Sequence, residues 1–168
     1  MASGDAVVEI LEVIQPGTSY AQFAARAGGS SPAESLPVYA FDSGTIEYLD
    51  FICRLRGYDG GGLTFTIAWT SATATGNNCR WSLAIRRFAD DAEDVDTSQT
   101  YDYNDVDCAC PSASGEIVYD NITFTDGADM DSWADTEVAI VRLRRNASHA
   151  NDNMSGDAQF IALAGKET

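Results

Sequence analysis

Two segments of the chain alternate apolar side chains with small or polar ones at a period of two. Between residues 63 and 70 the apolar side is formed by Leu63, Phe65, Ile67 and Trp69. Between residues 79 and 86 it is formed by Cys79, Trp81, Leu83 and Ile85. A period of two is typical of β-strands with one buried and one polar face. The connection, residues 71–78, consists of turn formers and short polar residues, so we expect two neighbouring strands.

The remaining pattern extends this prediction to the whole chain. At 168 residues, 45% of them hydrophobic, the chain fits one domain with a substantial core. Further strands are expected at residues 20–26, 36–42, 45–56, 101–103, 116–125, 137–145 and 157–163. With no regular helical pattern, we predict an all-β fold, a single jelly-roll antiparallel β-sandwich over residues 20–168. An N-terminal arm, residues 1–19, precedes it.

Three local features refine the prediction. In the strand at 45–56, Ile46 and Tyr48 lie on the opposite side from Leu49, which indicates a bulge or burial on both faces. The glycine-rich residues 58–62 predict a tight hairpin into the strand that begins at Gly62. Residues 108–115 are expected to form a loop.

The arm has an ambiguous pattern. Its apolar residues fall at helical spacing, but the segment is also β-branched enough to be a strand, so both conformations stay open. Exposed alone, such a stripe would be a liability, so we expect a sister copy or another partner to bury it. The stripe consists of Val7, Ile10, Leu11 and Ile14. The start has no basic region and Glu9 and Glu12 break the apolar run, so neither a signal peptide nor a membrane span is expected. Without export, the four cysteines should be reduced thiols.

The charge of the chain is strongly negative. It has 26 acidic residues against 10 basic ones, a net charge of -16. Such a charge repels phosphate backbones and anionic lipid surfaces, so nucleic acid and membranes are not expected as partners. The acidity suits either hydration in salt or a basic partner surface, and composition does not separate the two.

No constellation of residues indicates catalysis. His149, the only histidine, lies in a polar segment without a nucleophile motif, and we interpret it as a solvated loop residue. Paired carboxylates for glycoside hydrolysis could occur among so many acids, but spacing selects no pair. We therefore predict that the protein is not an enzyme.

Metal sites have partial signals only. Cys108 and Cys110 supply two of the four ligands that tetrahedral zinc needs. Two acidic clusters could attract calcium, residues 90–96 and the group Asp126, Asp129, Asp131, Asp135 and Glu137, but the second lacks the glycine of an EF-hand loop. We assign no metal and no cofactor.

The three tryptophans divide into two kinds. Trp69 and Trp81 lie on apolar strand faces, which favours the core over sugar stacking. Trp133 lies in an acidic loop, which makes it the aromatic residue expected to contact a partner.

Several blocks of the sequence resemble a jelly-roll family of tailed bacteriophages. The likeness covers about residues 20–165 and is carried by strand and turn patterns: residues 26–34, Phe41-Asp42, residues 47–51, 58–67 and 79–81, Tyr119-Asp120-Asn121-Ile122-Thr123-Phe124, and residues 140–145. This family is similar to the cement, or decoration, proteins of icosahedral heads. The family supplies no catalytic residues to transfer to this chain.

The resemblance implies a structural virion protein on the outer surface of a capsid, made in the host cytoplasm. Its partners would be the major capsid protein and itself, as a homodimer or homotrimer. It would clamp neighbouring shell subunits through many contacts at once. The alternative is a carbohydrate- or receptor-binding jelly-roll module of a phage tail or fibre, since sandwiches carry sugar sites on loops and faces. Exposed aromatic residues aligned on one face, or calcium in the acidic loops, would favour this alternative.

Overall fold

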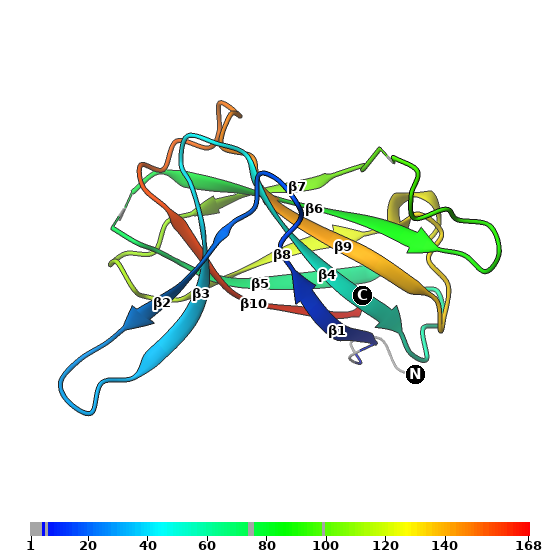
Figure 1. Ribbon diagram of the computed structural model, residues 1–168, viewed down its shortest axis with the longest axis horizontal. Coiled ribbons are helices and arrows are strands. Elements are labelled where there is room, and N and C mark those ends of the chain that lie inside the picture. Colours follow the sequence, from blue (N-terminus) through cyan, green and yellow to red (C-terminus); the bar gives the residue numbers. More distant parts are fainter. Residues whose placement is uncertain (1–4, 6, 74–75, 99) are drawn as a thin grey trace.

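The computed structural model describes residues 5, 7–73, 76–98 and 100–168 (Figure 1). Residues 1–4 and 6 of the expected arm lie outside this described part. Ten strands and one short 3-10 helix follow each other along the described chain. In order they are β1 (Val8–Ile14), β2 (Gln22–Ala27), β3 (Ser35–Phe41), β4 (Glu47–Leu55), β5 (Leu63–Ser71), β6 (Asn78–Phe88), β7 (Asn104–Ala109), β8 (Val118–Phe124), η1 (Ala128–Met130), β9 (Val138–Arg145) and β10 (Ala158–Glu167).

The strands form two five-stranded antiparallel sheets that pack face to face (Figure 1). Sheet A has the order β1-β4-β9-β6-β7, and sheet B has the order β2-β3-β10-β5-β8. The predicted all-β antiparallel sandwich is confirmed, and its architecture is consistent with a jelly roll. No helix among the described residues is long and apolar enough to span a bilayer.

The core lies between the two sheets and contains both predicted core tryptophans. Trp69 of β5 and Trp81 of β6 are fully buried and meet edge to face, with ring centroids 5.8 Å apart. They belong to opposite sheets, so the expectation that these two strands are neighbours is wrong. Alternation identifies the buried face of each strand, but two buried faces can meet across a sandwich as well as lie side by side.

The prediction of a hairpin at residues 58–62 is also wrong, because the two strands that this segment connects lie in different sheets. The segment joins β4 of sheet A to β5 of sheet B, so the chain crosses between the layers there. Gly62 has a φ of +81°, and a Cβ added to it would lie 2.6 Å from the carbonyl oxygen of Phe124. Glycine is required at this position by both the backbone conformation and the close approach of β8.

Strand β4 is buried on both faces near its start, and its pairing with β9 runs without a register shift. On the outer face Asp50 is only 7% exposed and forms an ion pair with Arg142 of β9. The rings of Tyr101 and Tyr103 cover this face, stacking on Arg142 and Arg144 at 4.2 and 3.6 Å. Burial of both faces of β4 explains why apolar residues change from one side of the strand to the other after Tyr48. The register shift that marks a bulge occurs in β1 and not in β4.

One edge strand decides between two conformations that the sequence left open, and another differs from the sequence prediction. The described part of the arm contains β1, which pairs with β4 at the edge of sheet A. The expected strand at 101–103 is absent, and β7 begins at Asn104 and includes Cys108 and Ala109, where a loop was predicted. The alternation in β7 is weak in the sequence because only Val106 and Cys108 are apolar on its inner side, and Asn104 and Ala109 at its ends do not follow the pattern.

Candidate binding groove

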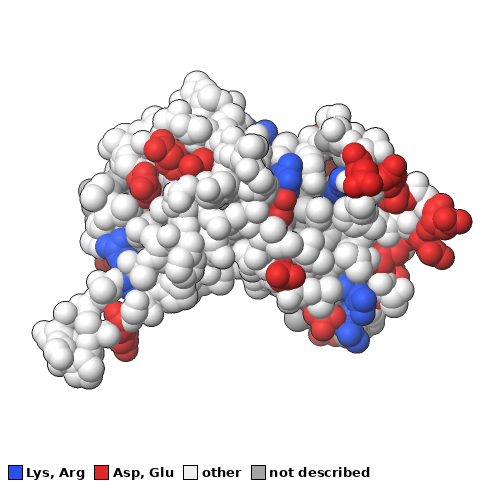
Figure 2. Space-filling view, viewed as in Figure 1, with Lys and Arg blue, Asp and Glu red and all other residues white. Residues whose placement is uncertain are grey.

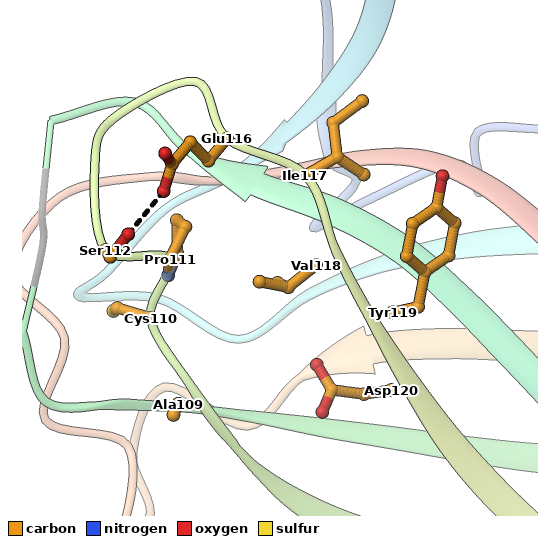
Figure 3. Close-up of a pocket in the computed structure, with 9 residues that line it drawn as sticks. All are labelled: Ala109, Cys110, Pro111, Ser112, Glu116, Ile117, Val118, Tyr119 and Asp120. Atoms are coloured by element: carbon orange, nitrogen blue, oxygen red, sulfur yellow. Dashed lines mark hydrogen bonds between the residues drawn. The ribbon is translucent and has the colours of Figure 1, made fainter.

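An open groove lies between edge strands β7 of sheet A and β8 of sheet B (Figure 3). Its volume is about 750 Å³, which is within the range of small-ligand sites. One wall comes from the end of β7 and the turn after it, and the other from β8 and the two residues before it. The lining residues are Ala109, Cys110, Pro111, Ser112, Glu116, Ile117, Val118, Tyr119 and Asp120.

The wall formed by β8 presents apolar side chains to solvent. Tyr119 is 69% exposed and Ile117 is 43% exposed, although both are large and apolar. Along this segment the side chains of Ile122 and Phe124 are buried in the core, and those of Ile117 and Tyr119 lie on the opposite, solvent-facing side. The groove therefore has an exposed aromatic ring and an aliphatic side chain that the fold itself does not need.

The carboxylates of the groove are held by hydrogen bonds from the protein. Glu116 accepts from the Ser112 hydroxyl at 2.5 Å and from the Ala113 backbone N–H at 3.0 Å. Asp120 accepts from the indole Nε1–H of buried Trp69 at 2.7 Å. Both side chains are thus fixed in position, one by its own loop and the other by the core (Figure 3 shows the bond from Ser112).

The groove lacks an activated nucleophile. Burial raises the pKa of the Cys110 thiol, so the thiolate is disfavoured at neutral pH. The Ser112 hydroxyl donates to Glu116, and the residues that line the groove include no histidine to act as its base. Fixed acceptors beside apolar surface suit reversible binding of a ligand with hydroxyl groups.

The predicted partner-binding stripe of the arm is not formed as expected. Val7 is 1% exposed and packs in the core of its own domain, because the segment is a strand and not a helix. Ile10 also packs against the core, and the bulge between Ile10 and Glu12 turns Leu11 outward. Leu11 and Ile14 are exposed by 49% and 39%, so only these two stay candidates for a partner contact.

Trp133 is not available as a contact residue, and that expectation is corrected. It is 2% exposed, and its indole N–H donates to the Glu137 carbonyl oxygen at 2.9 Å. The acidic residues around it stay at the surface while the ring folds under them into the core. A single large apolar residue in a polar loop commonly anchors that loop, which is its role here.

The other candidate residues lie apart from the groove. His149 is exposed, and its Nδ1 accepts from the Asn151 backbone N–H at 3.1 Å. In the second acidic cluster Asp129, Asp131 and Glu137 accept from the backbone N–H groups of Thr125, Arg87 and Ala134 respectively. Within the described ranges no three His, Cys, Asp or Glu side chains converge to hold a metal ion.

The groove could be recognised only in part from the sequence. The one available signal is that Ile117 and Tyr119 are apolar on the polar parity of the strand at 116–125. The pairing of this wall with Cys110 and Pro111 depends on β7, which the sequence does not reveal. Strands β7 and β8 are edge strands of different sheets, and the order of strands in the two sheets brings them opposite each other.

Comparison with known proteins identifies no family for this chain. No protein-family model and no curated protein matches the sequence. Among solved structures, one is a carbohydrate-binding module, TmCBM61, in complex with β-1,4-galactotriose, with 9% identity and a TM-score of 0.41 over 94% of this chain and 88% of that one. Another is the enzymatically active domain of bacteriophage CBA120 tailspike protein 4, with 10% identity and a TM-score of 0.43 over 92% of this chain and 19% of that one. Similarity at this level carries no argument about function.

Proposed function

We propose that this protein is a non-catalytic binding module that holds a carbohydrate in the groove between β7 and β8. The observation that carries the proposal is the position of Tyr119. Its ring is 69% exposed among the residues that line the groove, and Glu116 and Asp120, which also line it, carry acceptors that the protein already holds in place. In this proposal the chain is a carbohydrate- or receptor-binding module of a phage tail or fibre.

The chemistry of a sugar ring fits such a groove. A sugar presents a face of C–H groups and a rim of hydroxyls, so it needs apolar surface and polar acceptors together. Tyr119, Ile117 and Pro111 supply the apolar surface, and the carboxylates accept hydroxyl hydrogen bonds. Hydrogen bonds to charged acceptors contribute more than neutral ones, about 1.5–3 kcal/mol each.

The charge of the site selects among sugars. Glu116 and Asp120 line the groove of a chain with a net charge of -16. An anionic sugar would be repelled by the fixed carboxylates and by the surrounding field. The proposed ligand is therefore a neutral glycan.

The phage context of the proposal rests on the resemblance over residues 20–165. That resemblance also supports a second function, a cement protein that clamps major capsid subunits on the outside of a head. The feature that favours this second function is the exposed apolar edge of β1, where Leu11, Val13 and Ile14 are 49%, 38% and 39% exposed. An edge strand with apolar side chains is a ready contact for a neighbouring chain.

A glycan array read with the labelled protein tests the first function. The wild type is expected to bind neutral glycans and to leave sialylated and sulfated ones unbound. Tyr119→Ala should weaken binding by about 10-fold or more, since the stacking surface is lost. Tyr20→Ala is the matched control, because Tyr20 is also an exposed tyrosine, at 37%, but lies outside the groove.

Sedimentation with emptied phage heads separates the two functions. Binding to glycans without sedimentation supports the tail or fibre module. Sedimentation with heads that survives Tyr119→Ala, together with an array free of signal, would replace the groove proposal with the cement function.

A further inference from the structure

Hairpin β2–β3 projects from the body of the sandwich (Figure 1). The strands pair in the order Phe23 with Tyr39, Ala25 with Pro37 and Ala27 with Ser35. These residues share the parity of Ala21 and Phe41, which are fully buried between the sheets. The face of the hairpin that carries Phe23 is therefore a continuation of the core side of sheet B.

Sheet A does not extend over this continuation. Phe41 still packs against Trp81 of sheet A, with ring centroids 5.0 Å apart. One pair further out, Phe23 is 62% exposed, and its ring meets that of its hairpin neighbour Tyr39 edge to face at 5.6 Å. Ala25, Ala27 and Pro37 beyond it are exposed as well. A core-type apolar face thus lies open to solvent.

The opposite face of the hairpin is occupied within the domain. Arg26 donates to Gln159 Oε1 at 2.7 Å, to the Ser71 carbonyl oxygen at 3.1 Å and to Ser114 Oγ at 3.0 Å. Val38, of the same parity, is 1% exposed. Through Arg26 the hairpin is therefore fastened to β5, β10 and the β7–β8 connection, and the apolar face is held in one orientation.

The hairpin differs from the rest of the surface in charge. Between residues 20 and 41 the only charged residues are Arg26 and Glu34, in a chain of net charge -16. Figure 2 shows the projecting end of the hairpin as mostly uncharged, with one acidic group beside it, whereas acidic groups gather at the far end of the molecule. Other exposed large apolar side chains have several carboxylates close in sequence, namely Glu9 and Glu12 beside Leu11, the acidic loop around Val95, and Glu116 and Asp120 beside Tyr119. In the hairpin the one carboxylate is Glu34, in the loop beside the exposed Leu36.

We propose that the uncovered face of the β2–β3 hairpin, formed by Phe23, Ala25, Ala27, Pro37 and Tyr39, binds the same face of a second copy of this chain. A two-fold contact places identical residues opposite each other, so in an acidic chain it requires a surface without carboxylates. The hairpin face combines that property with exposed apolar area. The inference is independent of the function proposed for the groove.

The contact has a distinctive salt dependence. The joined faces are uncharged, while the two acidic bodies behind them repel each other. Salt screens that repulsion and leaves apolar contact intact, so the dimer should tighten as ionic strength rises. A contact formed by ion pairs would weaken instead.

Sedimentation velocity over a concentration series tests the proposal. The wild type should form a dimer below about 100 µM, and Phe23→Asp should weaken it by about 30-fold or more. Ala25→Asp is a second variant at the same face, and Tyr119→Asp is the control at an exposed aromatic residue elsewhere. Thermal melts of the monomeric forms verify that each variant is folded.

The outcomes decide the matter in either direction. Dissociation by Phe23→Asp and Ala25→Asp with an intact Tyr119→Asp dimer, tightening from about 0.05 M to about 0.5 M salt, supports the proposal. A wild type that stays monomeric at these concentrations, a dimer insensitive to Phe23→Asp, or a dimer that loosens in salt would overturn it.

Discussion

Arg145 of β9 and Asp152 of the following loop form an ion pair that is completely enclosed by the protein. The Nε–Oδ2 and Nη2–Oδ1 distances are 2.9 and 2.7 Å, and the side chains are 0% and 1% exposed. The remaining guanidinium hydrogens donate to the carbonyl oxygens of Phe41, Met154 and Gly156. All five donors have acceptors, which is the condition under which a buried arginine is tolerated. This pair ties the loop after β9 to the end of the sandwich.

Removing one partner of this pair is expected to be strongly destabilising. Asp152→Ala leaves a buried guanidinium without its counter-charge, which should cost about 3–5 kcal/mol in the free energy of unfolding. Chemical denaturation followed by tryptophan fluorescence measures the loss. Glu9→Ala is the control, because it breaks the exposed pair with Arg56 and should change stability little. Equal effects of the two substitutions would contradict a structural role for Arg145.

The crossing between the sheets at Gly62 provides a second prediction. Gly62→Ala introduces a Cβ into a position with φ of +81° and a carbonyl oxygen at 2.6 Å, and should cost about 2 kcal/mol or more. Gly17→Ala is the control, because a Cβ there meets nothing within 4 Å, and its effect should stay within about 0.5 kcal/mol. Denaturation midpoints of the two variants give the comparison. A fully tolerated alanine at position 62 would mean that β8 does not approach as described.

Asp129 predicts a specific dependence of stability on pH. Burial alone would raise its pKa, but hydrogen bonds from the Thr125 N–H at 2.6 Å and from Asn104 and Thr125 side chains at 3.0 Å outweigh burial and lower the pKa from its ordinary value of 3.8. A lowered pKa in the folded state means that the stabilisation is complete above pH 3.8 and is lost as the pH falls through the folded value.

Asp129→Asn should accordingly lower the melting temperature at pH 7 by about 2–4 °C, and by less in acid. Glu93→Gln, in the exposed acidic loop, serves as the control with no such change. Melts between pH 2 and pH 7 reveal the difference. A deficit in Asp129→Asn that persists undiminished at the lowest pH would show that charge is not its cause.

The sequence predicted which residues form strands better than it predicted which strands lie beside each other. Trp69 and Trp81 were placed correctly in the core by alternation, because hydrophobic burial acts on each strand separately. The assignment of β5 and β6 to different sheets depends on how the connection crosses the sandwich, which a polar loop does not encode. Trp133 and Val7 show the same limit, since local polarity or spacing does not reveal where a chain folds back on itself.

The cysteines report on the packing and on the groove. Burial raises the pKa of Cys53 to about 12 and raises those of Cys79 and Cys108 well above the usual thiol range, and all three are buried. Cys110 is partly exposed at the groove. A thiol reagent at pH 8 should therefore modify Cys110 first in the folded protein and all four thiols after denaturation.

The same reaction monitors occupation of the groove. A bound glycan should slow modification of Cys110, and Cys110→Ser should abolish the fast phase. Rapid modification of more than one thiol under native conditions would contradict the burial of the other three.

Titration calorimetry of the wild type and Tyr119→Ala with a neutral oligosaccharide selected on the array is the most direct test of the central claim. We expect saturable one-site binding by the wild type, a dissociation constant about 10-fold or more weaker for Tyr119→Ala, and no change for Tyr20→Ala. Wild-type and Tyr119→Ala proteins that bind equally well, or a wild type that binds no glycan at all, would contradict it.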